Sequence, residues 1–239
     1  MCQKIYRGIV MRIKAVLWDL DNTLLDFMRM KRTAVEIAVD YMLGAGLKGE
    51  RNELIEKIFH IYRQTHIESQ NALETVIQQQ MGKRFDPRIL ASGIIGYQRG
   101  RDLATYPYPG VEKTLKELLR MGMLLGTVSD APAEQCYNRL ARLHLIPWLD
   151  VVVTYDDTKE YKPSPKPFLL ALKKLKVAPE NVIYIGDWPE KDIIGAKRVG
   201  MITVFARWGE HPDAPDTGAD YDLKNIAEVL KIVRRLNKS

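Results

Sequence analysis

Residues 13–23 read IKAVLWDLDNT, and this stretch decides the fold. It is almost continuously apolar as far as Trp18 and then changes to DLDNT at residues 19–23. A short aliphatic run that ends in turn-forming residues is typical of a strand buried in a parallel sheet. The stretch therefore predicts a parallel α/β fold with two carboxylates, Asp19 and Asp21, directly after its first strand.

Four more short apolar runs follow, and helical patterns separate them. The runs cover residues 123–128, 151–154, 182–185 and 202–206. Apolar residues recur at helical spacing over 111–120, 133–143, 165–175 and 189–199, and a last helix is expected over 223–236. Strands that alternate with helices favour right-handed crossovers and a parallel sheet. The predicted fold class is α/β, with a doubly wound parallel Rossmann-like sheet.

The stretch from about Leu24 to Tyr106 breaks this alternation and contains no convincing strand. Helical spacing over roughly 30–43, 54–65, 72–80 and 87–99 predicts about four helices. Two prolines within residues 106–110 exclude a helix there, so this segment is expected to lead back to the sheet. We expect an α/β core domain over 11–24 and 106–239, which carries the catalytic site, and an α-helical domain over 25–105.

Composition narrows the class of protein. The chain has 239 residues, of which 46% are apolar, and its longest apolar runs are too short to cross a bilayer. No secretory signal is apparent, and residues 1–10 are interpreted as an extension or the product of an upstream start codon. Cys2 and Cys136 form no CxxC pair, which argues against a disulfide framework or a zinc site and predicts a cytoplasmic protein.

The net charge of +6 has two readings. A mild positive field favours anionic substrates, whereas a solvated basic surface needs no ligand at all. Nothing in the sequence resembles a nucleic-acid-binding module, and no membrane association is expected.

Polar side chains follow the predicted strands where each one ends. In an open parallel sheet, ligands bind beyond the carboxyl ends of the strands. Each of these residues alone has an ordinary reading as a turn former, a helix cap or a surface lysine. Together, in chain order, they would gather at one edge of the sheet: Asp19, Asp21, Ser129, Asp130, Lys162, Asp187 and Asp192.

This combination of groups suits phosphoryl transfer. Clustered carboxylates repel each other unless a cation or a shared proton is present, and Mg²⁺ prefers carboxylate and phosphate oxygens. Phosphoryl transfer needs a metal, an aligned nucleophile and fixed positive charge, and a carboxylate can act as the nucleophile. Lys162 supplies a point charge, and Ser129 supplies a hydroxyl donor.

The same residues resemble the four motifs of the haloacid dehalogenase superfamily, in its phosphatase branch. The motifs occur in order from Ile13 onward as DLDNT at 19–23, Ser129 at a strand end, Lys162 before Pro163, and Gly186-Asp187 with Asp192. The helical insertion is similar to the α-helical cap that this family carries after its first strand. Two positions depart from the usual pattern: Asp130 stands where many relatives have asparagine, and Trp188 follows Asp187.

The resemblance implies a catalytic role for the carboxylates of the first motif. Asp19 would be the nucleophile and a metal ligand. Asp21 would protonate the leaving group and then deprotonate the attacking water, and its backbone carbonyl would touch the metal. Ser129, Asp130 and Lys162 would bind the phosphoryl group, while Thr23 would help to fix the loop.

The resemblance also implies the cofactor and the kind of partner. Asp187 would ligate Mg²⁺ together with Asp19 and Asp21, and Asp192 would ligate the ion or hold a metal-bound water. The expected partner is a small phosphorylated metabolite. The sequence leaves open its identity, the oligomeric state, and which residues of about 24–106 select it, with Phe27, Arg29, Arg32 and Tyr97 as candidates.

Three other functions stay open. Haloacid dehalogenases share the nucleophile but lack the second carboxylate, so Asp21 favours a phosphatase. A phosphomutase would share the whole set. A catalytically idle binding or scaffold relative is disfavoured because the set is complete.

Overall fold

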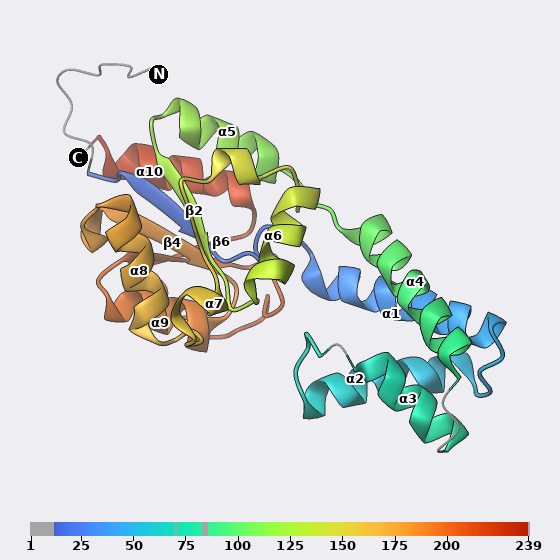
Figure 1. Cartoon of the computed structure of the whole chain (residues 1–239). Helices are drawn as coiled ribbons and strands as arrows, with labels where there is room; N and C mark the ends of the chain where they lie inside the picture. The colour runs from blue at the N-terminus through green and yellow to red at the C-terminus, as the bar shows by residue number, and fades with distance from the viewer. Residues whose placement is uncertain (1–11, 70, 83–85, 239) are drawn as a thin grey trace. The chain divides into compact units, whose positions relative to one another are not determined.

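The computed structural model describes residues 12–69, 71–82 and 86–238. The chain divides into two compact units, one formed by the described residues of Met1–Asp26 and Pro107–Ser239 and the other by those of Phe27–Tyr106 (Figure 1). The interpretation of residues 1–10 as an extension falls outside the described residues, as does Cys2.

The first unit is built on a six-stranded sheet with the order β3-β2-β1-β4-β5-β6. All neighbouring strands are parallel, which confirms the predicted parallel sheet. All five predicted strands are present, as β1 (Ala15–Trp18), β2 (Leu124–Val128), β3 (Val151–Val153), β4 (Val182–Gly186) and β5 (Ile202–Ala206).

The sixth strand corrects the sequence prediction at the C-terminal end. β6 (Tyr221–Leu223) pairs with β5 at the edge of the sheet, where a continuous helix from residue 223 was expected. The chain then makes a capping box between Asn225 and Glu228, passes through a 3-10 turn η4 (Ile226–Glu228), and forms α10 (Val229–Leu236). A strand of three residues is too short for an alternation pattern to distinguish it from a helix.

Helices cover both faces of the sheet, so the sheet is doubly wound as predicted. α5 (Val111–Arg120) and α10 lie on one face, and α8 (Pro165–Leu175) and α9 (Ile194–Arg198) lie on the other (Figure 1). α6 (Ala133–Arg142), the short α7 (Tyr155–Thr158), the 3-10 turns η1 (Ile146–Trp148) and η2 (Pro179–Asn181), and a π-helical turn η3 (Pro189–Ile193) complete the unit.

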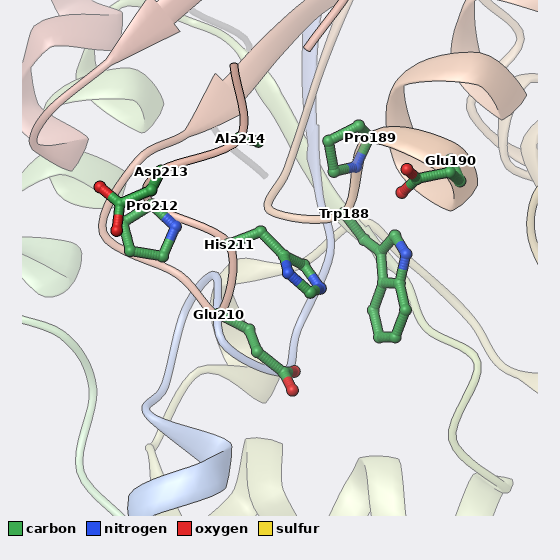
Figure 2. A pocket seen from close by; sticks show the side chains of 8 residues that line it. All are labelled: Trp188, Pro189, Glu190, Glu210, His211, Pro212, Asp213 and Ala214. Carbon is green, nitrogen blue, oxygen red and sulfur yellow. The ribbon is translucent and has the colours of Figure 1, made fainter. Parts of the chain in front are cut away.

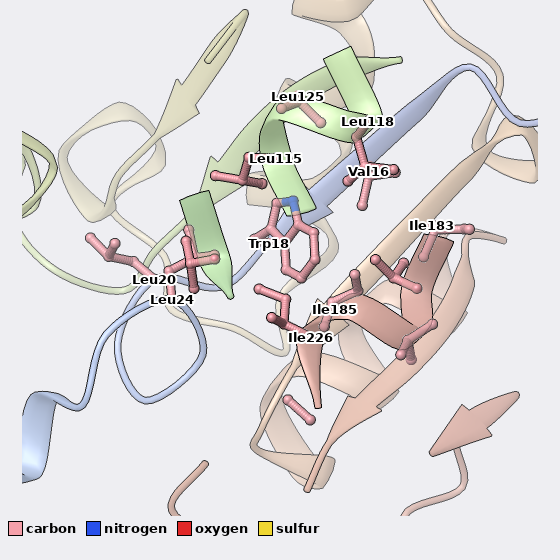
Figure 3. Packing of buried hydrophobic residues seen from close by; sticks show 14 of the residues in the cluster. Val16, Trp18, Leu20, Leu24, Leu115, Leu118, Leu125, Ile183, Ile185 and Ile226 are labelled. Carbon is pink, nitrogen blue, oxygen red and sulfur yellow. The ribbon is translucent and has the colours of Figure 1, made fainter. Parts of the chain in front are cut away.

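Two apolar layers hold the central strand in place. Val16 and Trp18 of β1 face the layer with α5, whereas Ala15 and Leu17 face the layer with α8. Figure 3 shows the Trp18 indole surrounded by aliphatic side chains, and Trp18 is fully buried. Close packing on both sides leaves β1 little freedom, so the residue that follows it is held in a fixed position.

The second unit is a separate helical domain with its own apolar core. Its described residues form four helices, in agreement with the expected number: α1 (Phe27–Gly44), α2 (Arg51–Gln64), α3 (Ala72–Met81) and α4 (Pro87–Ala104). α1 and α4 approach so closely that a Cβ on Gly100 would lie 2.6 Å from the Cα of Ala34. None of the helices in the described ranges is long and apolar enough to span a bilayer.

Two of the four residues considered for substrate selection, Arg32 and Tyr97, make contacts within this helical unit. The ammonium of buried Lys31 lies 4.2 Å from the ring centroid of Tyr62 and 5.2 Å from that of Tyr97. The guanidinium of Arg32 lies 5.1 Å from the Phe59 ring. Tyr97 and Arg32 therefore take part in cation–aromatic contacts inside the unit.

Candidate active site

The carboxyl ends of β1, β2 and β4 meet at one edge of the sheet. Trp18, the last residue of β1, is paired with Thr127 on one side and with Ile185 on the other. The residues that directly follow these neighbouring strands therefore lie side by side, as the sequence predicted. They are Asp19, Ser129 and Asp187.

Lys162 joins this edge from the segment between α7 and α8. Its ammonium donates to a carboxylate oxygen of Asp19 and, at 2.6 Å, to Oδ1 of Asp192. The Lys162 side chain is only 3% exposed. A buried ammonium is stable only when it is paired, and Lys162 has two charged partners here, Asp19 and Asp192.

Three buried carboxylates form a group that could hold a metal ion. One oxygen from each of Asp19, Asp187 and Asp192 lies within 4.8 Å of the others. When all are ionised, they exceed the charge of Lys162 by two units, and carboxylate oxygens are the ligands that hard divalent cations prefer. The donor set therefore fits a hard divalent cation.

The loops after β1 and β5 hold the Asp187 carboxylate in place. The backbone N–H of Glu210 donates to its Oδ2 at 2.8 Å, and the Thr23 hydroxyl donates to its Oδ1 at 3.2 Å. A Cβ on Gly209 would lie 2.2 Å from the Cβ of Asp187, so only glycine permits this approach. Glu210 and Gly209 were not predicted as parts of the site.

Burial perturbs the titration of the acidic groups. Burial raises the pKa of Asp19 well above its usual range, and Asp192 and Asp187 add to the effect, while Lys162 opposes it. Burial and repulsion from Asp192 raise the pKa of Asp187 to about 7. Burial alone would lower the pKa of Lys162, but Asp19 and Asp192 together raise it, so the lysine stays charged. The group therefore favours a bound cation over bound protons as the pH rises.

In the metal-free protein, we expect the free energy of unfolding to fall as the pH rises from about 4 to about 7. The folded chain keeps a proton on Asp187 up to about pH 7, whereas its ordinary pKa is 3.8, so the folded state binds more protons in this window. One such group contributes a slope of about 1.4 kcal/mol per pH unit. Urea unfolding at several pH values in the presence of a chelator measures this slope. Asp187→Asn should flatten the slope, and wild-type stability that rises across the window contradicts the expectation.

Ser129 and Asp130 lie at the end of β2, as predicted. The Ser129 side chain is buried, and its hydroxyl oxygen accepts a hydrogen bond from the N–H of Ala131 at 3.1 Å. The Asp130 carboxylate accepts from the backbone N–H of Lys162 at 2.9 Å. In this arrangement the carboxylate of Asp130 connects the loop after β2 to the segment that carries Lys162.

The Asp21 carboxylate lies in a different environment from that of Asp19. Its Oδ2 accepts a hydrogen bond from Nη1 of Arg139 at 2.6 Å. The loop around it turns sharply, since Asn22 has a φ of 57°, and the Trp208 indole donates to the carbonyl of Thr23 at 2.9 Å. Arg139 was not predicted as part of the site, because the contact joins residues far apart in the sequence.

Tyr184 is another residue of the site that the sequence analysis did not single out. Its fully buried hydroxyl donates to Oδ1 of Asp192 at 2.9 Å and accepts from the Lys162 ammonium at 3.3 Å. A tyrosine within an otherwise aliphatic buried strand was the signal available in the sequence, because a buried hydroxyl needs a partner.

A cavity of about 550 Å³ is lined by residues that follow β4 and β5. Figure 2 shows the imidazole of His211 next to the indole of Trp188, and their ring centroids are 4.7 Å apart. The residues that line the cavity are Trp188, Pro189, Glu190, Glu210, His211, Pro212, Asp213 and Ala214. With three carboxylates and no lysine or arginine, this lining disfavours an anionic occupant.

Comparisons with known proteins agree on one family. The family described as "Haloacid dehalogenase-like hydrolase" matches residues 16–206, a span that contains every predicted site residue. The glyceraldehyde 3-phosphate phosphatase of Methanocaldococcus jannaschii is 33% identical over 95% of this chain and 99% of its own length. The pyrophosphatase PpaX of Bacillus cereus is 27% identical over 96% of this chain and 100% of its own length.

A solved structure gives the same picture. The crystal structure of a HAD phosphatase from Thermococcus onnurineus aligns with a TM-score of 0.66 and 26% identity. The alignment covers 92% of this chain and 98% of that chain, so the similarity extends over both units.

Proposed function

Because the chain belongs to the haloacid dehalogenase-like hydrolase family, we propose that it is a Mg²⁺-dependent phosphatase acting on a small-molecule phosphate monoester through an aspartyl-phosphate intermediate. The observation that carries the proposal is the buried Asp19 carboxylate. It contacts the Lys162 ammonium and lies within the carboxylate group that fits a divalent cation.

We propose Asp19 as the nucleophile and Asp21 as the acid and base. An oxygen of Asp19 attacks phosphorus, the bond to the leaving oxygen breaks, and Asp21 gives that oxygen a proton. Asp21 then takes a proton from water, the water oxygen attacks phosphorus, and the bond to Asp19 breaks, which restores the carboxylate of Asp19 and the protonated carboxyl group of Asp21. The Lys162 ammonium and the Ser129 hydroxyl neutralise and orient the phosphoryl oxygens, with Asp130 supporting the Lys162 segment.

Asp19, Asp187, Asp192 and the backbone carbonyl of Asp21 are the proposed ligands of Mg²⁺. When bound, the ion supplies positive charge to the phosphoryl oxygens and offsets the mutual repulsion of the carboxylates. Asp192 also accepts hydrogen bonds from Lys162 and Tyr184, which suits either direct ligation or support of a metal-bound water.

The helical unit is proposed to act as a substrate-selecting cap. It is inserted between the first and second groups of site residues and folds around its own apolar core. The proposed domains are a catalytic core over 11–24 and 106–239 and a cap over 25–105. A small phosphorylated metabolite is the proposed substrate class, and a cytoplasmic location, predicted from cysteine usage, stays part of this proposal.

The retained Asp21 favours a phosphatase over a dehalogenase. Dehalogenation releases a halide, which needs no proton from the enzyme, whereas an alkoxide leaving group needs one. A phosphomutase would use the same residues and would differ in transferring the phosphoryl group back to a sugar phosphate, so release of inorganic phosphate separates the two activities.

We expect the purified protein to release inorganic phosphate from glyceraldehyde 3-phosphate with Mg²⁺ and to lose this activity with a chelator. The name of the Methanocaldococcus relative makes this triose phosphate the first substrate to test, and the name of the Bacillus relative adds pyrophosphate. Phosphoglycolate, sugar phosphates and nucleotides complete the panel. Restored activity on adding excess Mg²⁺ is the control, and phosphate release from no member of the panel would contradict the proposal.

A further inference from the structure

A buried arginine from α6 contacts the carboxylate next to the nucleophile. Nη1 of Arg139 donates to Oδ2 of Asp21 at 2.6 Å, and the two side chains are 7% and 23% exposed, respectively. Asp21 is two residues from Asp19, whereas Arg139 lies in the last turns of α6. The pair therefore connects the helix after β2 directly to the loop that carries the proposed acid and base.

Attachment of α6 to the core does not by itself call for an arginine at this position. Cys136 and Leu140 of α6 are fully buried and already belong to the apolar core. An arginine that is removed from water loses its hydration, and an apolar side chain of similar size would avoid this loss. What the arginine adds is a hydrogen bond with a defined direction to one carboxylate oxygen.

The loop that carries Asp21 is held by its own backbone bonds. The N–H of Leu24 donates to the carbonyl of Leu20 at 2.9 Å, and the N–H of Leu25 donates to the same carbonyl at 3.3 Å. Asp21 and Leu25 also form an isolated bridge. These bonds fix the position of the Asp21 backbone, but they do not set the rotation of its carboxyl group.

We propose that Arg139 is the positioning residue that orients the carboxyl group of Asp21 for proton transfer. This inference rests on the proposed function, in which Asp21 protonates the leaving group and activates water. Holding Oδ2 sets the plane of the carboxyl group and the direction of its other oxygen, and proton transfer depends steeply on such geometry.

The test compares two phosphate esters that differ in their need for a proton. An alkyl phosphate such as glycerol phosphate needs protonation of its leaving oxygen, whereas p-nitrophenyl phosphate releases a stable anion. The ratio kcat/KM reports only steps up to loss of the leaving group. For Arg139→Gln, we expect kcat/KM to fall about a hundredfold with the alkyl ester and less than about threefold with the nitrophenyl ester.

Two further variants separate orientation from folding. Arg139→Lys keeps the charge and a donor but not the planar guanidinium. Its kcat/KM with the alkyl ester should therefore be about tenfold higher than that of Arg139→Gln. In an Asp21→Asn background, Arg139→Gln should cause no further loss, because the group to be oriented is already gone. Arg142→Gln, in the same last turn of α6, is the matched control and should leave kcat/KM unchanged with both esters.

Equal losses with both esters, or a further loss in the Asp21→Asn background, would overturn the inference and leave Arg139 with a role in folding alone. Wild-type protein that releases phosphate neither from these esters nor from any member of the substrate panel in the presence of Mg²⁺ would instead overturn the proposed function, and the inference with it. The two failures are therefore distinguishable within one set of measurements.

Discussion

Asp19→Asn is expected to reduce phosphate release on the order of 10⁴-fold or more, since the amide is too weak a nucleophile to form the acyl phosphate. The amide retains the size of the carboxylate and an oxygen that accepts from Lys162, so the geometry around it should persist. Steady-state phosphate release with Mg²⁺ and the best substrate of the panel measures the loss.

The same variant should remain folded. Burial already makes the ionised form of Asp19 unfavourable in the metal-free protein, as its raised pKa indicates, and the amide removes that charge. Thermal unfolding with a chelator is therefore expected to give a Tm equal to or above that of the wild type. Asp156→Asn, which changes a partly exposed carboxylate of the same unit, is the control for activity. Turnover by Asp19→Asn near the wild-type rate would reject Asp19 as the nucleophile.

Lys162→Met should reduce turnover about 10³-fold and also destabilise the metal-free protein. The lysine contacts both Asp19 and Asp192 in a buried site, so its loss leaves two carboxylates without their ammonium partner. Removal of one member of a buried ion pair costs about 3–5 kcal/mol, and loss of a group that stabilises transferring charge costs about 10²–10³ in rate. Urea unfolding with a chelator at about pH 8 measures the first effect.

Mg²⁺ should restore much of the stability that Lys162→Met removes, because a divalent cation also offsets the repulsion of the carboxylates. Lys166→Met is the matched control: Lys166 lies on α8, its side chain is 63% exposed, and it pairs with Glu160 at the surface. Such an exposed pair contributes at most about 1 kcal/mol. Equal losses of stability in the two variants would contradict the claim that Lys162 stabilises the buried carboxylates.

The carboxyl ends of the strands were predictable from the sequence for a simple reason. Each buried strand is an aliphatic run that stops at polar residues, and parallel strands place those stops at one edge. Asp19 and Asp187 directly follow strands and are therefore found together by this pattern, whereas Lys162 and Asp192 were expected from the order of the four motifs. The short edge strand β6 was missed because its three residues carry too little pattern.

The supporting contacts were less predictable. Arg139 reaches Asp21 across more than a hundred residues, and the helical pattern of α6 marks it only as one polar position among several. Gly209 approaches Asp187 because the loop after β5 folds back over the site, which depends on the whole sheet order. The Asp130 carboxylate accepts from the backbone N–H of Lys162, a bond that residue type alone does not specify.

A chemical trap for the phosphorylated carboxylate tests the mechanism most directly. The protein is mixed with substrate and Mg²⁺, quenched in acid within one turnover, and treated with borohydride, which reduces an acyl phosphate to an alcohol. Peptide mass spectrometry is expected to find homoserine at position 19 and aspartate at positions 21, 187 and 192. Homoserine at another position, or none at all while phosphate is released, would show that Asp19 does not carry the phosphoryl group.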